Sequence, residues 1–215
     1  MYLLKIMSHV ALAILVINVI LYLIGFSKNG KAYKVFSIYL LSIALVQGFM
    51  ALLAAQNINN HFVSTYYLFF QFILLSCFFY NIFGHVNQRK SNVIKYVSGV
   101  ICACLLVQYI IYPESYYTFN SIGFLITSVI LIIYSVLYLY EMLTKKLLFY
   151  YVTIGIFIYL ISSSLIFATA ASIVSFKDDL YLYIWKTNAV LFIIYQLLIL
   201  WEWKQQFLPK MTKQR

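Results

Sequence analysis

The polar residues best able to carry chemistry lie near the C-terminal end of the chain. Asn188, Tyr195 and Glu202 are spaced by seven residues, so in a helix they share one face. An amide, a phenol and a carboxylate on one face could line a ligand pocket or bind a partner. The structural alternative gives Asn188 one hydrogen bond between helices and puts Glu202 at a membrane surface. Lys186 could extend this face or reach the outer membrane surface.

Two residues on other segments belong to the same hypothesis. Ser163 lies in a segment rich in small and hydroxyl residues, which favours close helix packing, with a hydroxyl-lined cavity as the alternative. Gln71 is one of several isolated amides, which either pair helices through hydrogen bonds or converge on a polar ligand. These amides are Asn18, Gln47, Gln71, Asn81, Gln108 and Asn120. The predicted ligand or partner face comprises Lys186, Asn188, Tyr195, Glu202, Gln71 and Ser163.

Residues suited to catalysis, metal binding or ion coupling are sparse. The carboxylates fall in loops or near the ends of apolar runs, at Glu114, Glu141, Asp178, Asp179 and Glu202. Transporters driven by protons or sodium usually need a carboxylate in the middle of a helix. The cysteines have no nearby histidine or carboxylate that could complete a metal site. We therefore expect no enzyme activity, no metal and no cofactor, and we rank transport below a binding role.

The elements that must position these residues are membrane-spanning helices. Hydrophobic residues make up 65% of the chain and charged residues 9%, against about 25% charged in a soluble domain. A soluble fold could not hide so much apolar surface, whereas a lipid bilayer accepts it. The net charge is +10, but the basic residues lie in short loops between apolar runs. We therefore expect the lipid bilayer as a partner, and no nucleic acid.

Seven apolar runs are long enough to cross a bilayer, which takes about 20 residues. They are continuous and do not alternate, so a β-barrel is excluded. The sequence predicts an all-α bundle of seven transmembrane helices over residues 1–203, followed by a short basic tail at 204–215. The predicted helices cover about 7–26, 35–55, 62–83, 96–112, 119–140, 148–174 and 181–203.

The basic residues predict which loops face the cytoplasm. Most of them alternate with the apolar runs onto one side: Lys28, Lys31, Lys34, Arg89, Lys90, Lys95, Lys145, Lys146 and the tail residues Lys204, Lys210, Lys213 and Arg215. Cytoplasmic loops carry an excess of lysine and arginine. This pattern predicts a multi-pass protein of the cell (inner) membrane, with its N-terminus outside and its C-terminus in the cytoplasm.

Three segments, 66–75, 154–162 and 184–191, resemble recurring parts of uncharacterised bacterial seven-helix membrane proteins. They read Tyr-Tyr-Leu-Phe-Phe-Gln-Phe-Ile-Leu-Leu, Ile-Gly-Ile-Phe-Ile-Tyr-Leu-Ile-Ser and Ile-Trp-Lys-Thr-Asn-Ala-Val-Leu. Such proteins are similar to the membrane modules that precede sensor kinases or stand alone near them. The resemblance implies a sensing role. Two departures are Gln71, where such proteins are expected to have an acidic residue, and the expected absence of an output domain.

These observations favour a non-enzymatic membrane sensor or an interaction or accessory subunit. A small or lipidic ligand or a membrane partner would shift the helix packing around Asn188, Tyr195 and Glu202. A separate membrane or cytoplasmic protein would then receive the signal. The alternative, from a different functional class, is a small-molecule transporter or channel.

Overall fold

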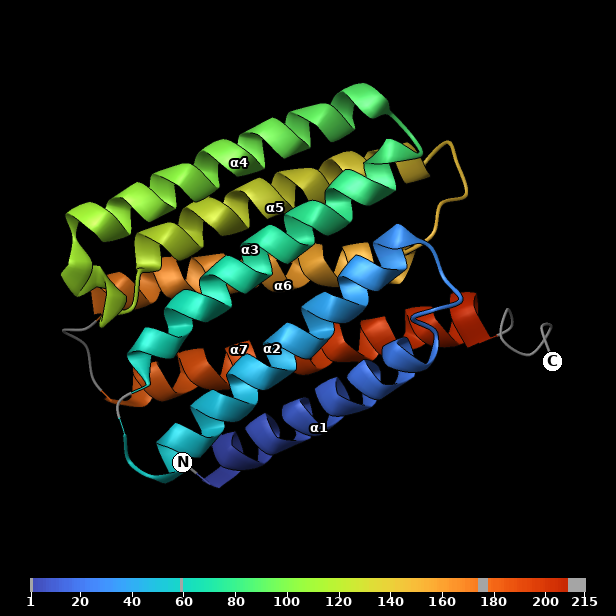
Figure 1. Cartoon of the computed structure of the whole chain (residues 1–215). Helices are drawn as coiled ribbons and strands as arrows, with labels where there is room; N and C mark the ends of the chain where they lie inside the picture. The colour runs from blue at the N-terminus through green and yellow to red at the C-terminus, as the bar shows by residue number, and fades with distance from the viewer. Residues whose placement is uncertain (1, 59, 174–177, 209–215) are drawn as a thin grey trace. The chain divides into compact units, whose positions relative to one another are not determined.

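The computed structural model describes residues 2–58, 60–173 and 178–208, with the side chains of 2, 3, 5, 166–182 and 184 outside the description. Within these ranges the long segments are all α-helices and no residue lies in a β-strand, so the all-α prediction is confirmed. The long helices are α1 (Tyr2–Ile24), α2 (Lys31–Ala55), α3 (His61–Gly84), α4 (Gln88–Ile111), α5 (Ser121–Met142), α6 (Tyr150–Ile173) and α7 (Asp178–Glu202) (Figure 1). A short 3₁₀ helix, η1 (Pro113–Tyr116), follows α4, and a π-helical turn, η2 (Trp203–Phe207), follows α7.

Five of the described helices are long and apolar enough to cross a membrane. They are Ile6–Ile24 within α1, together with α2, α3, α4 and α5, and they contain between 19 and 25 residues. The part of α6 whose side chains are described, Tyr150–Leu165, is a shorter apolar helix. Five such helices mark the chain as a multi-pass membrane protein.

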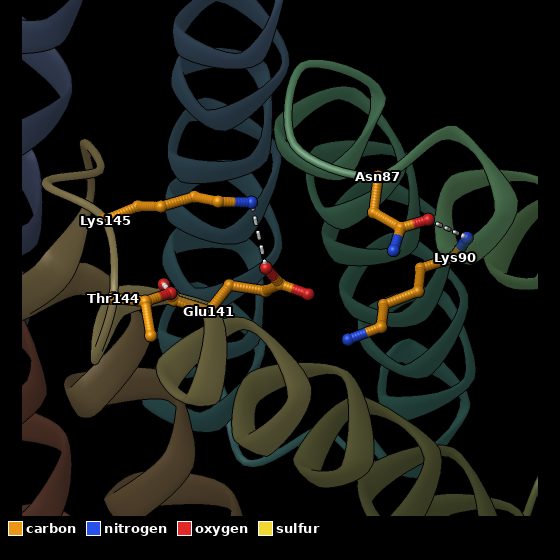
Figure 2. A network of polar contacts seen from close by, with 5 residues as sticks. All are labelled: Asn87, Lys90, Glu141, Thr144 and Lys145. Atoms are coloured by element: carbon orange, nitrogen blue, oxygen red, sulfur yellow. Dashed lines mark hydrogen bonds and ion pairs between the residues drawn. The ribbon is translucent and has the colours of Figure 1, made fainter.

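Helix α4 begins at Gln88, well before the apolar run that starts near residue 96. The Asn87 side chain accepts a hydrogen bond from the backbone N–H of Lys90 and so caps the helix (Figure 2). An N-cap of this kind contributes about 1 kcal/mol to helix stability. The first turns are polar, with Arg89 and Lys95 among them, so the apolar run alone marks only the later part of this helix.

The chain forms two units: unit 1 comprises 1–28 and 128–215, and unit 2 comprises 29–127. In unit 1, α7 packs against both α1 and α6. In unit 2, α3 packs against both α2 and α4. Each unit thus has one helix that contacts two others.

The core of unit 2 is built on the aromatic residues of α3. Phe78 packs against Phe36 of α2 with ring centroids 5.2 Å apart, and both side chains are fully buried. On the side of α4, the Ser91 hydroxyl donates a hydrogen bond of 2.9 Å to the carbonyl oxygen of Tyr80. Apolar packing and a local polar contact therefore join α3 to its two neighbours.

In unit 1, contacts along α7 give the directions of its two neighbours. Asn18 and then Tyr22 of α1 meet Gln196 and then Ile199 of α7, so α1 and α7 run parallel. Helix α6 runs the opposite way, because its N-terminal end meets Glu202 and its middle meets the preceding turns of α7. Helix α7, which carries most of the residues that the sequence singled out, therefore packs against both α1 and α6.

Candidate functional site

Glu202 at the end of α7 caps the beginning of α6. Its carboxylate oxygens accept hydrogen bonds from the backbone N–H groups of Phe149 (2.7 Å) and Tyr151 (2.8 Å), and its side chain is fully buried. The first N–H groups of a helix have no partner within the helix and carry the positive end of its dipole. A carboxylate accepts hydrogen bonds from these N–H groups, and its negative charge interacts favourably with the positive end of the dipole. Glu202 therefore holds the end of α7 against the start of α6.

The backbone at Phe149 has an unusual conformation that this contact helps to hold. Its φ angle is +66°, in the left-handed region that non-glycine residues rarely adopt. The Phe149 ring packs against Phe207 of η2 with centroids 5.3 Å apart, while its N–H binds Glu202. Contacts at both the ring and the N–H therefore fix the turn that starts α6.

Tyr195 lies seven residues before Glu202, on the same face of α7, and packs tightly against α6. Its ring stacks on Tyr159 with centroids 5.4 Å apart and planes 8° apart. Gly155 approaches the same ring so closely that an added Cβ would lie 2.8 Å from the Tyr195 Cδ2 atom. Gly155 lies in the segment rich in small residues, and any side chain at this position would meet Tyr195.

Asn188 lies seven residues before Tyr195 on α7 and differs from Tyr195 and Glu202 in its contacts. Its Oδ1 atom is buried, yet no described residue donates a hydrogen bond to it. The antiparallel register that pairs Phe149 with Glu202 brings Ser163 of α6 level with Asn188. Ser163 is buried and its hydroxyl donates to the carbonyl oxygen of Leu160 in its own helix. The acceptor of Asn188 is therefore available to another donor.

The remaining predicted site residues do not join this face. The Lys186 Nζ atom lies 5.5 Å above the ring of Tyr183 in the preceding turn of α7, a cation–π contact. Gln71 is buried on α3 and belongs to unit 2, whereas the other five predicted residues belong to unit 1. Within unit 1, Tyr195 and Glu202 meet one neighbouring helix, and Asn188 continues their face.

Sequence reasoning missed a second polar face of α7, directed at α1. The Asn18 Nδ2 atom donates to the backbone oxygen (2.8 Å) and the Oε1 atom (2.9 Å) of Gln196, and both side chains are buried. The Tyr22 hydroxyl donates to the carbonyl oxygen of Ile199 over 3.4 Å. Pairing of two helices was one of the two roles considered for Asn18, and its hydrogen bonds to Gln196 join α1 to α7. Gln196 adjoins Tyr195 in sequence, so a search along one face of α7 passes over it.

Unit 2 holds its own polar network around Asn120. The Asn120 Nδ2 atom donates to the Tyr109 hydroxyl (3.1 Å) and to the Gln108 Oε1 atom (3.3 Å). Its Oδ1 atom accepts from the backbone N–H of Gly123 (2.9 Å) and so caps α5. These amides pair α4 with the start of α5, which is the structural role weighed for isolated amides.

A tyrosine pair links α3 to η1 in the same unit. The hydroxyl oxygens of Tyr66 and Tyr116 lie 2.7 Å apart in a hydrogen bond. This bond, with smaller effects from burial and neighbouring tyrosines, raises the pKa of Tyr116 to about 12. Tyr116 therefore stays neutral throughout the physiological pH range and serves to hold η1 against α3.

The described residues include no group of three or more histidine, cysteine, aspartate or glutamate side chains that could hold a metal ion. The chain matches no protein-family model, no curated protein and no solved structure.

Proposed function

We propose that this chain is a non-enzymatic membrane sensor or accessory subunit that acts through a protein partner. The observation that carries the proposal is the buried Oδ1 atom of Asn188, which has no hydrogen-bond donor among the described residues. Leaving such an acceptor unsatisfied costs about 1–3 kcal/mol. A donor from a ligand or a partner would recover this free energy.

The contacts of Tyr195 and Glu202 limit which part of the predicted face of α7 can bind a ligand or partner. Both side chains are buried against α6 through the tyrosine stack and the carboxylate cap. Asn188 is then the member of the face that remains for recognition. A donor bound to Asn188 would displace α7. The contacts at Tyr195 and Glu202 would transmit this displacement to the start of α6, at the other end of unit 1.

The topology that accompanies this proposal has seven crossings, with the N-terminus outside and the C-terminus in the cytoplasm of the cell (inner) membrane. The basic loops support it. The parallel direction of α1 and α7 also supports it, because the first and seventh crossings of such a chain run the same way. In this topology Asn188 lies in the outer half of the membrane, and Glu202 lies at the inner surface.

Affinity purification of the tagged full chain from its native membranes in a mild detergent, followed by mass spectrometry, tests the function. We expect a stoichiometric protein partner with the wild-type chain and a roughly tenfold lower recovery of that partner with Asn188→Ala. Thr187→Ala is the matched control. Its side chain is exposed, its hydroxyl bonds to the carbonyl oxygen of Tyr183 in the same helix, and it adjoins Asn188.

Two results would contradict the proposal in different ways. Equal recovery of the partner with Asn188→Ala would show that recognition lies elsewhere than on this face of α7. Recovery of the chain without any protein partner, but with a retained small molecule, would favour a transporter or channel.

A further inference from the structure

The α5–α6 connection and the π-helical turn η2 line an open cleft of about 640 Å³ in unit 1. Its polar lining consists of Thr144, Lys145, Lys146, Tyr150, Tyr151 and Gln206. Two ammonium groups, together with hydroxyl and amide groups, form a set of hydrogen-bond donors suited to the oxygens of a phosphate. The polar part of this lining is therefore suited to an anion.

The charge in the cleft remains positive after its internal contacts are counted. Lys145 forms an ion pair of 3.3 Å with Glu141, one turn earlier in α5 (Figure 2). Lys146 has no ion-pair partner among the described residues. The other nearby carboxylate, Glu202, already accepts the backbone N–H groups of α6. At least one lysine thus faces the cleft without a compensating carboxylate.

Two hydrogen bonds fix the backbone at the end of the connection that lines the cleft. The Tyr138 hydroxyl donates to the carbonyl oxygen of Leu148 (3.1 Å), and the next residue, Phe149, is bound by Glu202. The backbone at this end of the cleft therefore needs little ordering when the cleft is occupied.

Exposed aromatic residues favour a position of the cleft at the level of the lipid headgroups. Tyr140, Tyr150 and Trp201 are exposed where α5 ends, α6 begins and α7 ends. Amphipathic aromatic side chains gather at this level of a membrane. The Lys204 Nζ atom lies 5.5 Å above the Trp201 ring and adds a cation there. Leu143, at the rim of the cleft, is 79% exposed and is suited to contact an acyl chain.

We propose that this cleft binds the phosphate of an anionic phospholipid. Lys145 and Lys146 contact the phosphate, and Leu143 contacts the adjoining acyl chain. This lipid site is separate from the Asn188 face on α7 and does not depend on the partner proposed above. An occupied site braces the α5–α6 connection beside the turn at Phe149, and so stabilises the start of α6.

Native mass spectrometry of the full chain, purified in a mild detergent, tests the site with two lipids of identical acyl chains. We expect phosphatidylglycerol to bind in preference to phosphatidylcholine. In Lys145→Gln/Lys146→Gln the affinity for phosphatidylglycerol should fall roughly 25-fold, about fivefold for each lysine. Lys145→Arg/Lys146→Arg keeps the charge and should keep most of the affinity.

The matched control is Lys28→Gln/Lys31→Gln, which removes the same charge from two exposed lysines beside another predicted cytoplasmic loop. This control should lower the affinity less than threefold, since its lysines lie outside the cleft. An equal fall in both double variants would overturn the proposal, because it would show that only the overall charge matters. Equal binding of the two lipids would overturn it as well. So would binding of inorganic phosphate as tight as that of the anionic lipid, because the ligand would then be a soluble anion.

Discussion

Individual polar side chains in unit 1 join neighbouring helices through hydrogen bonds. Glu202 is the clearest case, because one carboxylate satisfies two backbone N–H groups at the start of another helix. Asn18 and Gln196 join α1 to α7 through a hydrogen bond between their amide groups. Each of these contacts satisfies buried polar groups and fixes which helices are neighbours.

Replacing the carboxylate of Glu202 should loosen the start of α6. Glu202→Gln keeps the size of the side chain, but its Nε2 atom would face a backbone N–H group and cannot accept from it. We expect the free energy of unfolding to fall by about 2 kcal/mol, as for other hydrogen bonds to charged groups. Unfolding of the purified protein by denaturing detergent measures this. Lys204→Gln, two residues further on and exposed, is the control and should change stability little.

The sequence predicted part of this residue-scale organisation. The seven-residue spacing predicted that Tyr195 and Glu202 share a face, and both do contact α6. The spacing could not predict that the partner of Glu202 is backbone, because that depends on where a helix distant in sequence begins. Gln196 was missed for a related reason: its function depends on α1 lying on a different side of α7.

At the scale of elements, close approach of backbones decides how α6 and α7 pack. Gly155 permits this approach because it has no side chain to meet the Tyr195 ring. Composition alone predicted the close packing of this segment. It could not identify which of the small residues is essential, since this depends on which residue of α7 lies opposite.

A methyl group at position 155 should push α6 and α7 apart. In Gly155→Ala the new Cβ would lie 2.8 Å from Tyr195 Cδ2, and the buried, stacked ring has little room to move. We expect the free energy of unfolding to fall by about 1–3 kcal/mol, an overpacking cost that exceeds the helix-propensity gain of alanine over glycine.

Gly99→Ala in α4 is the matched control for this substitution, because nothing lies within 4 Å of its added Cβ. It should leave stability unchanged or raise it by up to about 1 kcal/mol. Thermal unfolding in the same detergent compares the two variants. If Gly155→Ala proves as stable as Gly99→Ala, the helices do not approach as closely as the glycine contact indicates.

At the scale of the whole molecule, apolar composition was the most reliable guide. It predicted an all-α membrane protein, and the helical structure with five long apolar helices agrees. The positions of helix ends were harder to predict, as the polar first turns of α4 illustrate, because a capped helix can extend past its apolar run. The number of crossings and their direction remain predictions from the basic loops.

Cysteine labelling in intact cells tests the direction of the crossings. The native Cys77, Cys102 and Cys104 are first replaced by serine, since at least Cys77 and Cys104 are exposed. Single cysteines are then introduced as Gln56→Cys, in the α2–α3 loop predicted to lie outside, and Thr144→Cys, in the α5–α6 connection predicted to lie in the cytoplasm. Both positions are exposed, so burial does not limit the reaction at either.

A membrane-impermeant maleimide should label Gln56→Cys in intact cells and Thr144→Cys only after permeabilisation, because the excess of lysine and arginine retains the α5–α6 connection inside. The opposite pattern would invert the topology, move Asn188 to the inner half of the membrane and place the lysine cleft at the outer surface. Labelling of both positions in intact cells would mean that an odd number of helices between them fails to cross. The same two cysteines therefore test the side of the membrane on which each proposed site acts.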